Sequence, residues 1–524
     1  MSGPSWRIAE EEKAVGTQQT PVHTSDRPAH GTGCPLEAGC APAVSGPGRG
    51  CNRPGRFFAA QQLCLQSVGG LDKLRSVLKT PGGDERQALA RGGGLRPGET
   101  GVAEGGSVRE AKDLYAVGEV PPDFHVPRTM HAWAIRRERH GRPKTAMQLE
   151  VVPTPEIASD EVLVLVMAAG VNYNGIWAAL GEPVSMFDVH KQSFHVAGSD
   201  ASGIVWAVGS RVKRWKPGDE VVIHCNQDDG DDEECNGGDP MYSPSQRIWG
   251  YETPDGSFAQ FCRVQSRQLM ERPKHLTWEE AACYTLTLAT AYRMLFGHRP
   301  HVLRPGQNVL VWGASGGLGS YAVQLCAIAG ANAIGVISDD AKTDFVLQMG
   351  AKGVINRNNF RCWGQLPKVN SPEFNEYMKE ARKFGKAIWQ ITGNKDVDIV
   401  FEHPGESTMP TSVFVVKRGG MVVICAGTTG FNLTMDARFL WMRQKRVQGS
   451  HFANLLQASQ ANQLMLERRL DPCMSEVFPW SDIPLAHEKM LDNKHLPGNM
   501  AVLVTASKPG LRTLEDVLEA GPLR

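Results

Sequence analysis

A glycine-rich turn between Gly313 and Gly319 has the composition of a phosphate-binding site. It follows Asn308–Trp312 (NVLVW), which is typical of a buried strand, and it leads into a segment with apolar residues at helical spacing. The spacing is GxxGxxG rather than the strict GxGxxG. The glycines still allow a tight turn and a close backbone approach, so that a pyrophosphate can lie at the helix N-terminus. The residues predicted to bind a dinucleotide are Gly313, Ala314, Ser315, Gly316, Gly317, Leu318 and Gly319.

The next predicted strand, Asn332–Ile337, ends in residues that bear on the choice of cofactor. It is followed by Ser338-Asp-Asp-Ala-Lys342. An acid at this place usually accepts the ribose 2′-hydroxyl of NAD. Ser338, Lys342 and Arg357 can instead hold a 2′-phosphate, and we therefore favour NADPH. The alternative for the two aspartates is a helix N-cap and a first-turn acid, which suits Asp equally well.

The elements that position this turn define an α/β fold class. From Asn308 the chain alternates strand, turn, helix and strand, which predicts a doubly wound parallel (Rossmann) sheet with helices on both faces. Upstream, short β-rich runs are separated by Gly/Pro turns, which predicts a β-rich, partly barrel-like domain. The runs are Glu161–Ala168, Ala201–Val208 and Glu220–His224.

Composition separates the first residues from the rest and excludes several function classes. Residues 1–105 hold 19 of the 56 Gly and 9 of the 33 Pro, which predicts a low-complexity, disordered extension over 1–111 or a start codon placed too far upstream. A regulatory or partner-binding tail is the alternative. The balance of 56 Lys and Arg against 56 Asp and Glu argues against a nucleic-acid binder. No apolar run is long enough for a membrane span, and no apolar leader follows the first Met, so we expect a cytoplasmic protein.

The order of the two predicted domains resembles the medium-chain dehydrogenase/reductase superfamily, in which many members carry a catalytic zinc. Such a zinc needs three protein ligands. The corresponding segments here read Ala169–Gly175 (AGVNYNG) and Gly198-Ser-Asp200, without Cys or His. We therefore expect no metal, and a substrate that is already electrophilic. The acidic stretch Cys225–Cys235 does not have calcium-loop spacing and is expected to be a solvated loop with two free thiols.

Six longer segments carry a more specific resemblance. On these segments, the chain from about Lys112 to Arg524 resembles the crotonyl-CoA carboxylase/reductases, which are enoyl-thioester reductases of that superfamily. They are AAGVNYNGIWA (168–178), QRIWGYETPDGSFAQF (246–261), PKHLTWEEAACYTLTLATAYRML (273–295), VWGASGGLGSYAVQL (311–325), DVDIVFEHPGE (396–406) and QKRVQGSHFANL (444–455).

The resemblance implies NADPH-dependent reductive carboxylation of crotonyl-CoA with CO2 to ethylmalonyl-CoA, in the ethylmalonyl-CoA route of acetate assimilation. Hydride delivered to the β-carbon makes an enolate, and its α-carbon attacks CO2. The CO2 pocket implied by the motifs consists of Asn174, Tyr251, Glu252 and His403. Asn174 is expected to donate to a CO2 oxygen and His403 to donate directly or through a water, while Glu252 orients that water or the imidazole.

From the residues alone, His403 follows the apolar strand Val397–Phe401, and ligands bind at the carboxyl ends of such strands. The alternative for His403 is a purely structural histidine. The alternatives for the other three are a turn residue for Asn174, a surface acid for Glu252 and a core or rim aromatic for Tyr251.

The resemblance also implies a homotetramer and a split, GroES-like catalytic domain. This domain comprises residues 112–290 and 450–524, the Rossmann domain comprises 291–449, and the active site lies between them. Residues 360–392 resemble the family's oligomerisation region, although a surface helix explains them equally well. Candidates for the CoA phosphates are Arg443, Lys445 and Arg446.

Three other functions stay open at this point. A plain NADPH-dependent 2-enoyl-CoA reductase would protonate the enolate. A quinone oxidoreductase of the same fold would ignore crotonyl-CoA. An NADPH-binding structural protein would bind the cofactor without turning over a thioester.

Overall fold

The computed structural model describes residues 111–522, so the predicted N-terminal extension lies outside the described residues except for Ala111. The described residues belong to one compact unit. Most of its strands belong to two sheets, one parallel and one mainly antiparallel. No helix in the range 111–522 is both long enough and apolar enough to cross a membrane.

The parallel sheet has the strand order of a doubly wound dinucleotide-binding fold, β13-β12-β11-β14-β15-β16. Its strands are β11 (Asn308–Val311), β12 (Asn332–Ile337), β13 (Gly353–Asn356), β14 (Val397–Glu402), β15 (Val416–Ile424) and β16 (Arg446–Gly449). Its helices are α6 (Gly317–Ile328), α7 (Thr343–Gln348), α8 (Pro372–Thr392), α9 (Met409–Val415) and α10 (Ala437–Trp441). The α/β fold class is confirmed.

Helix α6 is buried on more than the one face that the helical spacing of its apolar residues predicts. Every residue from Gly319 to Cys326 is buried. One face packs on the parallel sheet and the other is covered by α5 (Thr285–Phe296), on which α11 (Leu455–Leu466) packs in turn. The helix is followed by Gly330, which adopts the left-handed conformation (φ 70°) that is common after a helix C-terminus.

The second sheet contains strands from both ends of the described chain. Its order is β10-β6-β5-β3-β18-β17, with β9 also paired to β3. The strands are β3 (Glu161–Val171), β5 (Ala201–Val208), β6 (Glu220–Ile223), β9 (Phe261–Gln265), β10 (Leu269–Glu271), β17 (Met474–Phe478) and β18 (Asn499–Leu503). Strand β3 is buried from Val162 to Val171 because it lies between β5, β9 and β18.

Shorter elements complete this half. A small sheet has the order β2-β1-β4, and β7 pairs with β8. These strands are β1 (Thr129–Ile135), β2 (Gln148–Pro153), β4 (His195–Val196), β7 (Asn226–Gln227) and β8 (Arg247–Ile248). The helices are α1 (Pro143–Ala146), α2 (Tyr173–Leu180), α3 (Met186–Val189), α4 (Trp278–Ala282), α12 (Ile483–Leu491) and α13 (Leu514–Ala520).

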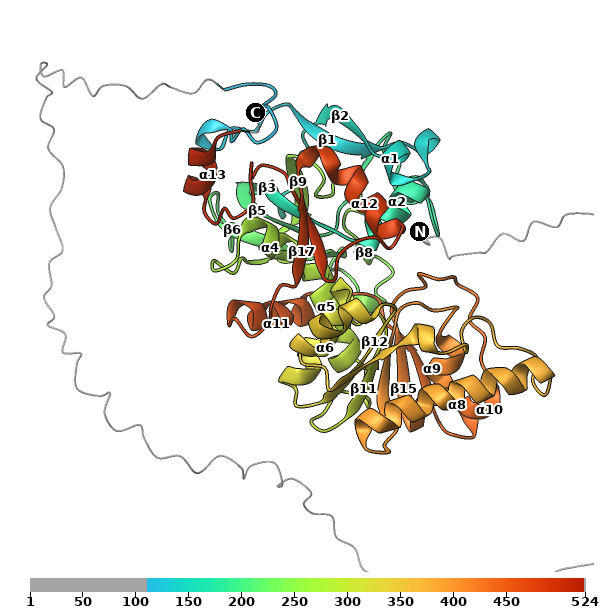
Figure 1. Cartoon of the computed structure of the whole chain (residues 1–524). Helices are drawn as coiled ribbons and strands as arrows, with labels where there is room; N and C mark the ends of the chain where they lie inside the picture. Colours follow the sequence, from blue (N-terminus) through green and yellow to red (C-terminus); the bar gives the residue numbers. More distant parts are fainter. Residues whose placement is uncertain (1–110, 523–524) are drawn as a thin grey trace, which may run out of the picture. The chain divides into compact units, whose positions relative to one another are not determined.

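Two features of these elements bear on the expected domain organisation. The expected boundary between residues 290 and 291 falls inside α5, which packs on α6 and carries α11 on its other side. The insert at 360–392 contains the long helix α8, whose apolar side packs on the parallel sheet around Phe384 and Ile388 (Figure 1).

Two helical glycines allow the packing of α6 on the phosphate-binding turn to be tested. A Cβ atom at Gly319 would lie 2.2 Å from the Gly313 carbonyl oxygen, whereas a Cβ atom at Gly385 in α8 would meet nothing within 4 Å. We expect Gly319→Ala to lower the free energy of unfolding by about 1–3 kcal/mol through overpacking. The control Gly385→Ala should raise it by about 0.5–1 kcal/mol because Ala favours helix. Urea unfolding measures both, and a Gly319→Ala protein as stable as the control would contradict this packing.

Candidate active site

A cavity of about 570 Å³ lies at the point where the parallel sheet reverses its strand order, between β11 and β14. Ligands bind at such switch points in open α/β sheets. The cavity brings together eight of the residues predicted from the sequence. They are Asn174, Tyr251, Gly313, Gly316, Gly317, Leu318, Gly319 and His403.

His403 follows β14 directly and points back at the end of β11. Its Nε2 lies 3.1 Å from the backbone oxygen of Trp312. Because a carbonyl oxygen only accepts, Nε2 carries the hydrogen of the neutral ring and Nδ1 is left as an acceptor. Burial lowers the pKa of His403 to about 4, so the ring is neutral at pH 7. Gly313 is required here, because its φ is 55° and a Cβ atom would lie 2.6 Å from His403 Nε2.

Asn174 lies in the first turn of α2, immediately after β3. Its Nδ2 donates to Ser199 Oγ at 3.4 Å, which leaves the second N–H of the amide free to face the cavity. The next residue, Gly175, allows α2 to pack closely on α12, because a Cβ atom there would lie 2.3 Å from His487 Nε2. This packing holds the start of α2 at the cavity wall.

Tyr251 and Glu252 lie on a tight turn after β8, and their side chains point to different neighbours. The Tyr251 hydroxyl donates to the Glu182 carbonyl oxygen at 2.8 Å, and burial raises the pKa of this phenol to about 12. The Glu252 carboxylate accepts from the Ile248 backbone N–H at 2.8 Å, and burial raises its pKa. Unlike Tyr251, Glu252 is not among the residues that line the cavity. The structure thus places Glu252 behind the turn, where it holds the backbone that presents Tyr251.

The residues predicted to hold a 2′-phosphate lie together at the ends of β12 and β13. The last register pair joins Ile337 to Asn356, so the next residues, Ser338 and Arg357, are neighbours. Lys342 ends the short helical turn Asp340–Lys342, which the Asp339 side chain caps through the Ala341 N–H at 3.1 Å. The N-cap alternative for Asp339 is therefore confirmed.

Several cavity residues were not predicted from the sequence. They include Asn172, Thr287, Cys425, Phe431, His451, His495 and Asn499. Asn499 begins β18, and its Oδ1 lies 2.0 Å from where a Cβ atom of Gly317 would be. The chain from β18 also reaches the phosphate-binding turn through the Gly498 N–H, which donates to the Ser315 oxygen at 2.9 Å. Asn172, Thr287 and His451 lie within the segments that carry the family resemblance, but nothing in those segments marks them as cavity residues. Asn499 lies in no such segment, because only the return of the chain to the first half brings β18 here.

The acidic loop is more ordered than the solvated loop that the sequence predicts. Asp228 is only 4% exposed and pairs with Arg267 at 2.7 Å. Both Cys225 and Cys235 are free thiols, as predicted.

Within residues 111–522, the one group of side chains with metal-ligand spacing is Asp229, Asp232 and Cys235 in this loop, and none of them lines the cavity.

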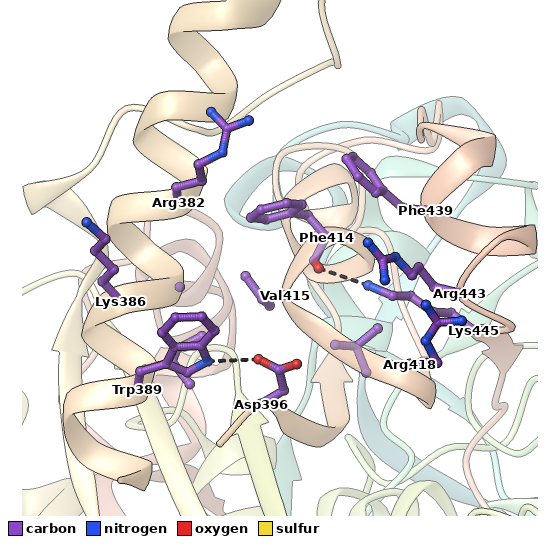
Figure 2. Close-up of a pocket in the computed structure, with 13 residues that line it drawn as sticks. Arg382, Lys386, Trp389, Asp396, Phe414, Val415, Arg418, Phe439, Arg443 and Lys445 are labelled. Atoms are coloured by element: carbon purple, nitrogen blue, oxygen red, sulfur yellow. Dashed lines mark hydrogen bonds between the residues drawn. The ribbon is translucent and has the colours of Figure 1, made fainter. Parts of the chain in front are cut away.

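A second cavity, also of about 570 Å³, lies at the amino-terminal end of the parallel strands (Figure 2). Five cationic side chains line it, namely Arg382, Lys386, Arg418, Arg443 and Lys445. The single acid, Asp396, accepts from Trp389 Nε1 at 2.8 Å. Burial lowers the pKa of Lys445 to about 8. Two candidates for the CoA phosphates, Arg443 and Lys445, therefore lie at the opposite end of the sheet from the first cavity.

Comparisons with known proteins agree with this architecture. Residues 158–274 match the alcohol dehydrogenase GroES-like domain, and residues 317–467 match the zinc-binding dehydrogenase family. A crotonyl-CoA carboxylase/reductase of Cereibacter sphaeroides is 79% identical over 411 residues, which cover 78% of this chain and 96% of that protein. The chain belongs to the crotonyl-CoA carboxylase/reductase family.

Solved structures of crotonyl-CoA carboxylase/reductases have the same fold. One superposes with a TM-score of 0.77 at 75% identity and covers 79% of this chain and 97% of that structure. Another, AntE in complex with NADP, has a TM-score of 0.73 at 47% identity and covers 76% of this chain and all of that structure. The resemblance found in the sequence is thereby confirmed.

The half-buried position of His403 beside the Trp312 carbonyl predicts how its ring titrates. The pKa falls from 6.5 to about 4, so the unfolded chain binds this proton at a higher pH than the folded chain does. As the pH falls from 6.5 to about 4, His403 therefore lowers the free energy of unfolding. NMR of labelled histidines, assigned with His403→Gln, should show no titration of this ring between pH 5 and 8. A midpoint near 6.5 would contradict the burial argument.

Proposed function

We propose that this protein catalyses the NADPH-dependent reductive carboxylation of crotonyl-CoA with CO2 to ethylmalonyl-CoA. The observation that carries the proposal is the convergence of Asn174, His403 and the Gly313–Gly319 turn on one cavity at the switch point. When bound, NADPH supplies the hydride for the β-carbon of the thioester. The resulting enolate attacks CO2 through its α-carbon.

The chain's own residues fit the cofactor at two places. Because residues 313, 316, 317 and 319 are glycines, no side chain blocks the backbone at the N-terminus of α6, where the pyrophosphate would lie. Ser338, Lys342 and Arg357 offer one hydroxyl and two cations at the adjacent strand ends, where the 2′-phosphate would lie.

Asn174 can donate its free amide N–H to a CO2 oxygen and, as carboxylation proceeds, to the growing carboxylate. His403 cannot donate from Nε2 at the same time, because that N–H is directed at the Trp312 oxygen. Its free Nδ1 can accept from a water molecule, and the second hydrogen of this water can then reach CO2. A neutral ring also provides no acidic proton that would quench the enolate.

Glu252 acts on this pocket through the backbone. Its carboxylate fixes the Ile248 N–H, and the Glu252 N–H donates to the Ile248 oxygen at 2.8 Å. This closed turn presents the Tyr251 backbone to the cavity, while the Tyr251 hydroxyl is held by Glu182. The turn therefore forms part of the cavity wall and does not donate a proton to the reacting atoms.

The remaining proposals concern the setting of the reaction. We place it in the cytoplasm, in an ethylmalonyl-CoA route, and in a homotetramer in which α8 takes part in assembly. We keep the split catalytic domain around a Rossmann domain but assign α5 and α11 to the Rossmann domain, because α5 packs on α6 and α11 packs on α5.

The Asn174 role predicts a change in the product rather than in NADPH oxidation. Replacing Asn174 with the similarly sized Leu removes one hydrogen bond to a charged group, worth about 1.5 kcal/mol, so the carboxylated share, taken relative to the merely reduced thioester, should fall about tenfold. Mass analysis of the thioesters measures this share. Asn375→Leu, on the exposed side of α8, is the matched control, and size-exclusion chromatography verifies that it assembles as wild type does. An unchanged share in Asn174→Leu would reject the role.

A further inference from the structure

Asp200 is a fully buried acid directly behind the cavity wall. It immediately precedes β5 and is 0% exposed. Its Oδ2 accepts from Asn172 Nδ2 at 3.1 Å, and its Oδ1 accepts from the Leu286 N–H at 2.9 Å. A very short contact joins Oδ1 to the Thr285 hydroxyl. Asp200 thus connects the residue before α2 with the first turn of α5, and residues from both places line the cavity.

The hydrogen atoms around Thr285 can be counted. Its oxygen lies beside Asp200 Oδ1 and also 2.6 Å from the Ile223 carbonyl oxygen. A hydroxyl has one hydrogen, and a carbonyl and a carboxylate both only accept. With an ionised Asp200, one of these two oxygen–oxygen contacts would have no hydrogen. With a proton on Asp200 Oδ1, Asp200 donates to Thr285, Thr285 donates to Ile223, and every contact is satisfied.

The surroundings of Asp200 offer no compensating charge. No ion pair of Asp200 is found in the described part of the chain. The titratable groups that act on it or feel it come from four neighbouring elements and are Cys225, Cys283, Tyr284 and Tyr321. Burial raises the pKa of all four, so each is uncharged at pH 7. Burial likewise raises the pKa of Asp200, to about 7, although its hydrogen bonds oppose this.

We propose that Asp200 is a positioning residue that the folded protein holds in its protonated, uncharged form, with the proton directed at Thr285. Its second oxygen fixes the Asn172 amide. Asn172 occupies the N-cap of α2, where Asn normally accepts from the helix, yet its side chain makes no such bond. The amide is turned to Asp200 instead.

The consequence rests on the proposed function. An enolate and then a carboxylate form in a cavity that Asn172, Leu286 and Thr287 line. An ionised Asp200 behind these residues would repel both anions at low dielectric. The protonated acid leaves the wall uncharged, and its proton is engaged by Thr285 and so is not offered to the enolate.

The pH dependence of stability tests the protonation of Asp200 without reference to activity. The unfolded acid ionises near pH 3.8 and the folded acid near 7. As the pH rises through this window, wild type should lose stability relative to Asp200→Asn. The ratio of unfolding constants, wild type over variant, should rise by up to about tenfold per pH unit. A ratio that is flat or falls over this range would overturn the proposal.

Two controls separate this effect from other causes. Ser202 lies on β5, which begins directly after Asp200, and donates a buried hydrogen bond to the Trp278 oxygen. Ser202→Ala removes this bond but no titrating group, so the ratio of the unfolding constants of wild type and this variant should not change with pH. If Asp200→Asn does not fold, infrared spectra of wild type with labelled aspartate decide the question. A protonated, buried aspartic acid band that disappears as the pH rises through about 7 supports the proposal. Its absence at pH 5 contradicts it.

Activity provides a separate readout. NADPH oxidation by wild type should slow as the pH rises through about 7, and this decline should be absent from Asp200→Asn. If neither protein oxidises NADPH with crotonyl-CoA, the proposed function fails, while the stability measurement still decides the state of Asp200.

Discussion

The meeting of β11 and β14 at their carboxyl ends is the constraint on which the site depends. The two strands are paired in parallel, so the glycine-rich turn after β11 and His403 after β14 must emerge side by side. The space between them is so small that only glycine fits at 313. The direction of the imidazole and its tautomer therefore follow from one hydrogen bond, which the His403 ring donates to the Trp312 carbonyl oxygen.

Burial around the cavity favours the uncharged form of several titratable groups. Burial lowers the pKa of His403 and raises the pKa values of Asp200 and Glu402. Each of these shifts favours the neutral form of its group. An enolate has two fates, attack on CO2 and protonation, and a wall of neutral, hydrogen-bonded groups disfavours the second. The polar side chains that remain, such as the Asn174 amide, can direct a molecule that has no net charge.

Much of the fold could be predicted because its sequence signals are local. Strand β12 and the strand β5 have the predicted bounds, and the glycine-rich turn with its helix lies where the spacing placed it. The environment of α6 could not be predicted, because α5 covers the face that periodicity assigns to solvent. Asn174 and His403 were found through motifs. The contact between Asp200 and Thr285 joins residues that are 85 positions apart, and only the folded chain reveals it.

The position of Glu252 shows the limit of motif reasoning in a different way. The motif correctly brings its turn to the cavity, but it does not determine which way a side chain points within the turn. The hydrogen bond to the Ile248 N–H decides this, and it directs the carboxylate into the turn itself.

The central claim is that the reduced thioester captures CO2, and isotope incorporation tests it most directly. The protein would be mixed with crotonyl-CoA, NADPH and excess 13C-bicarbonate, and the thioesters would be analysed by mass. The account predicts one labelled carbon in the thioester for each NADPH oxidised. Unlabelled butyryl-CoA as the main product under saturating CO2 would contradict it and would leave a plain enoyl-CoA reductase.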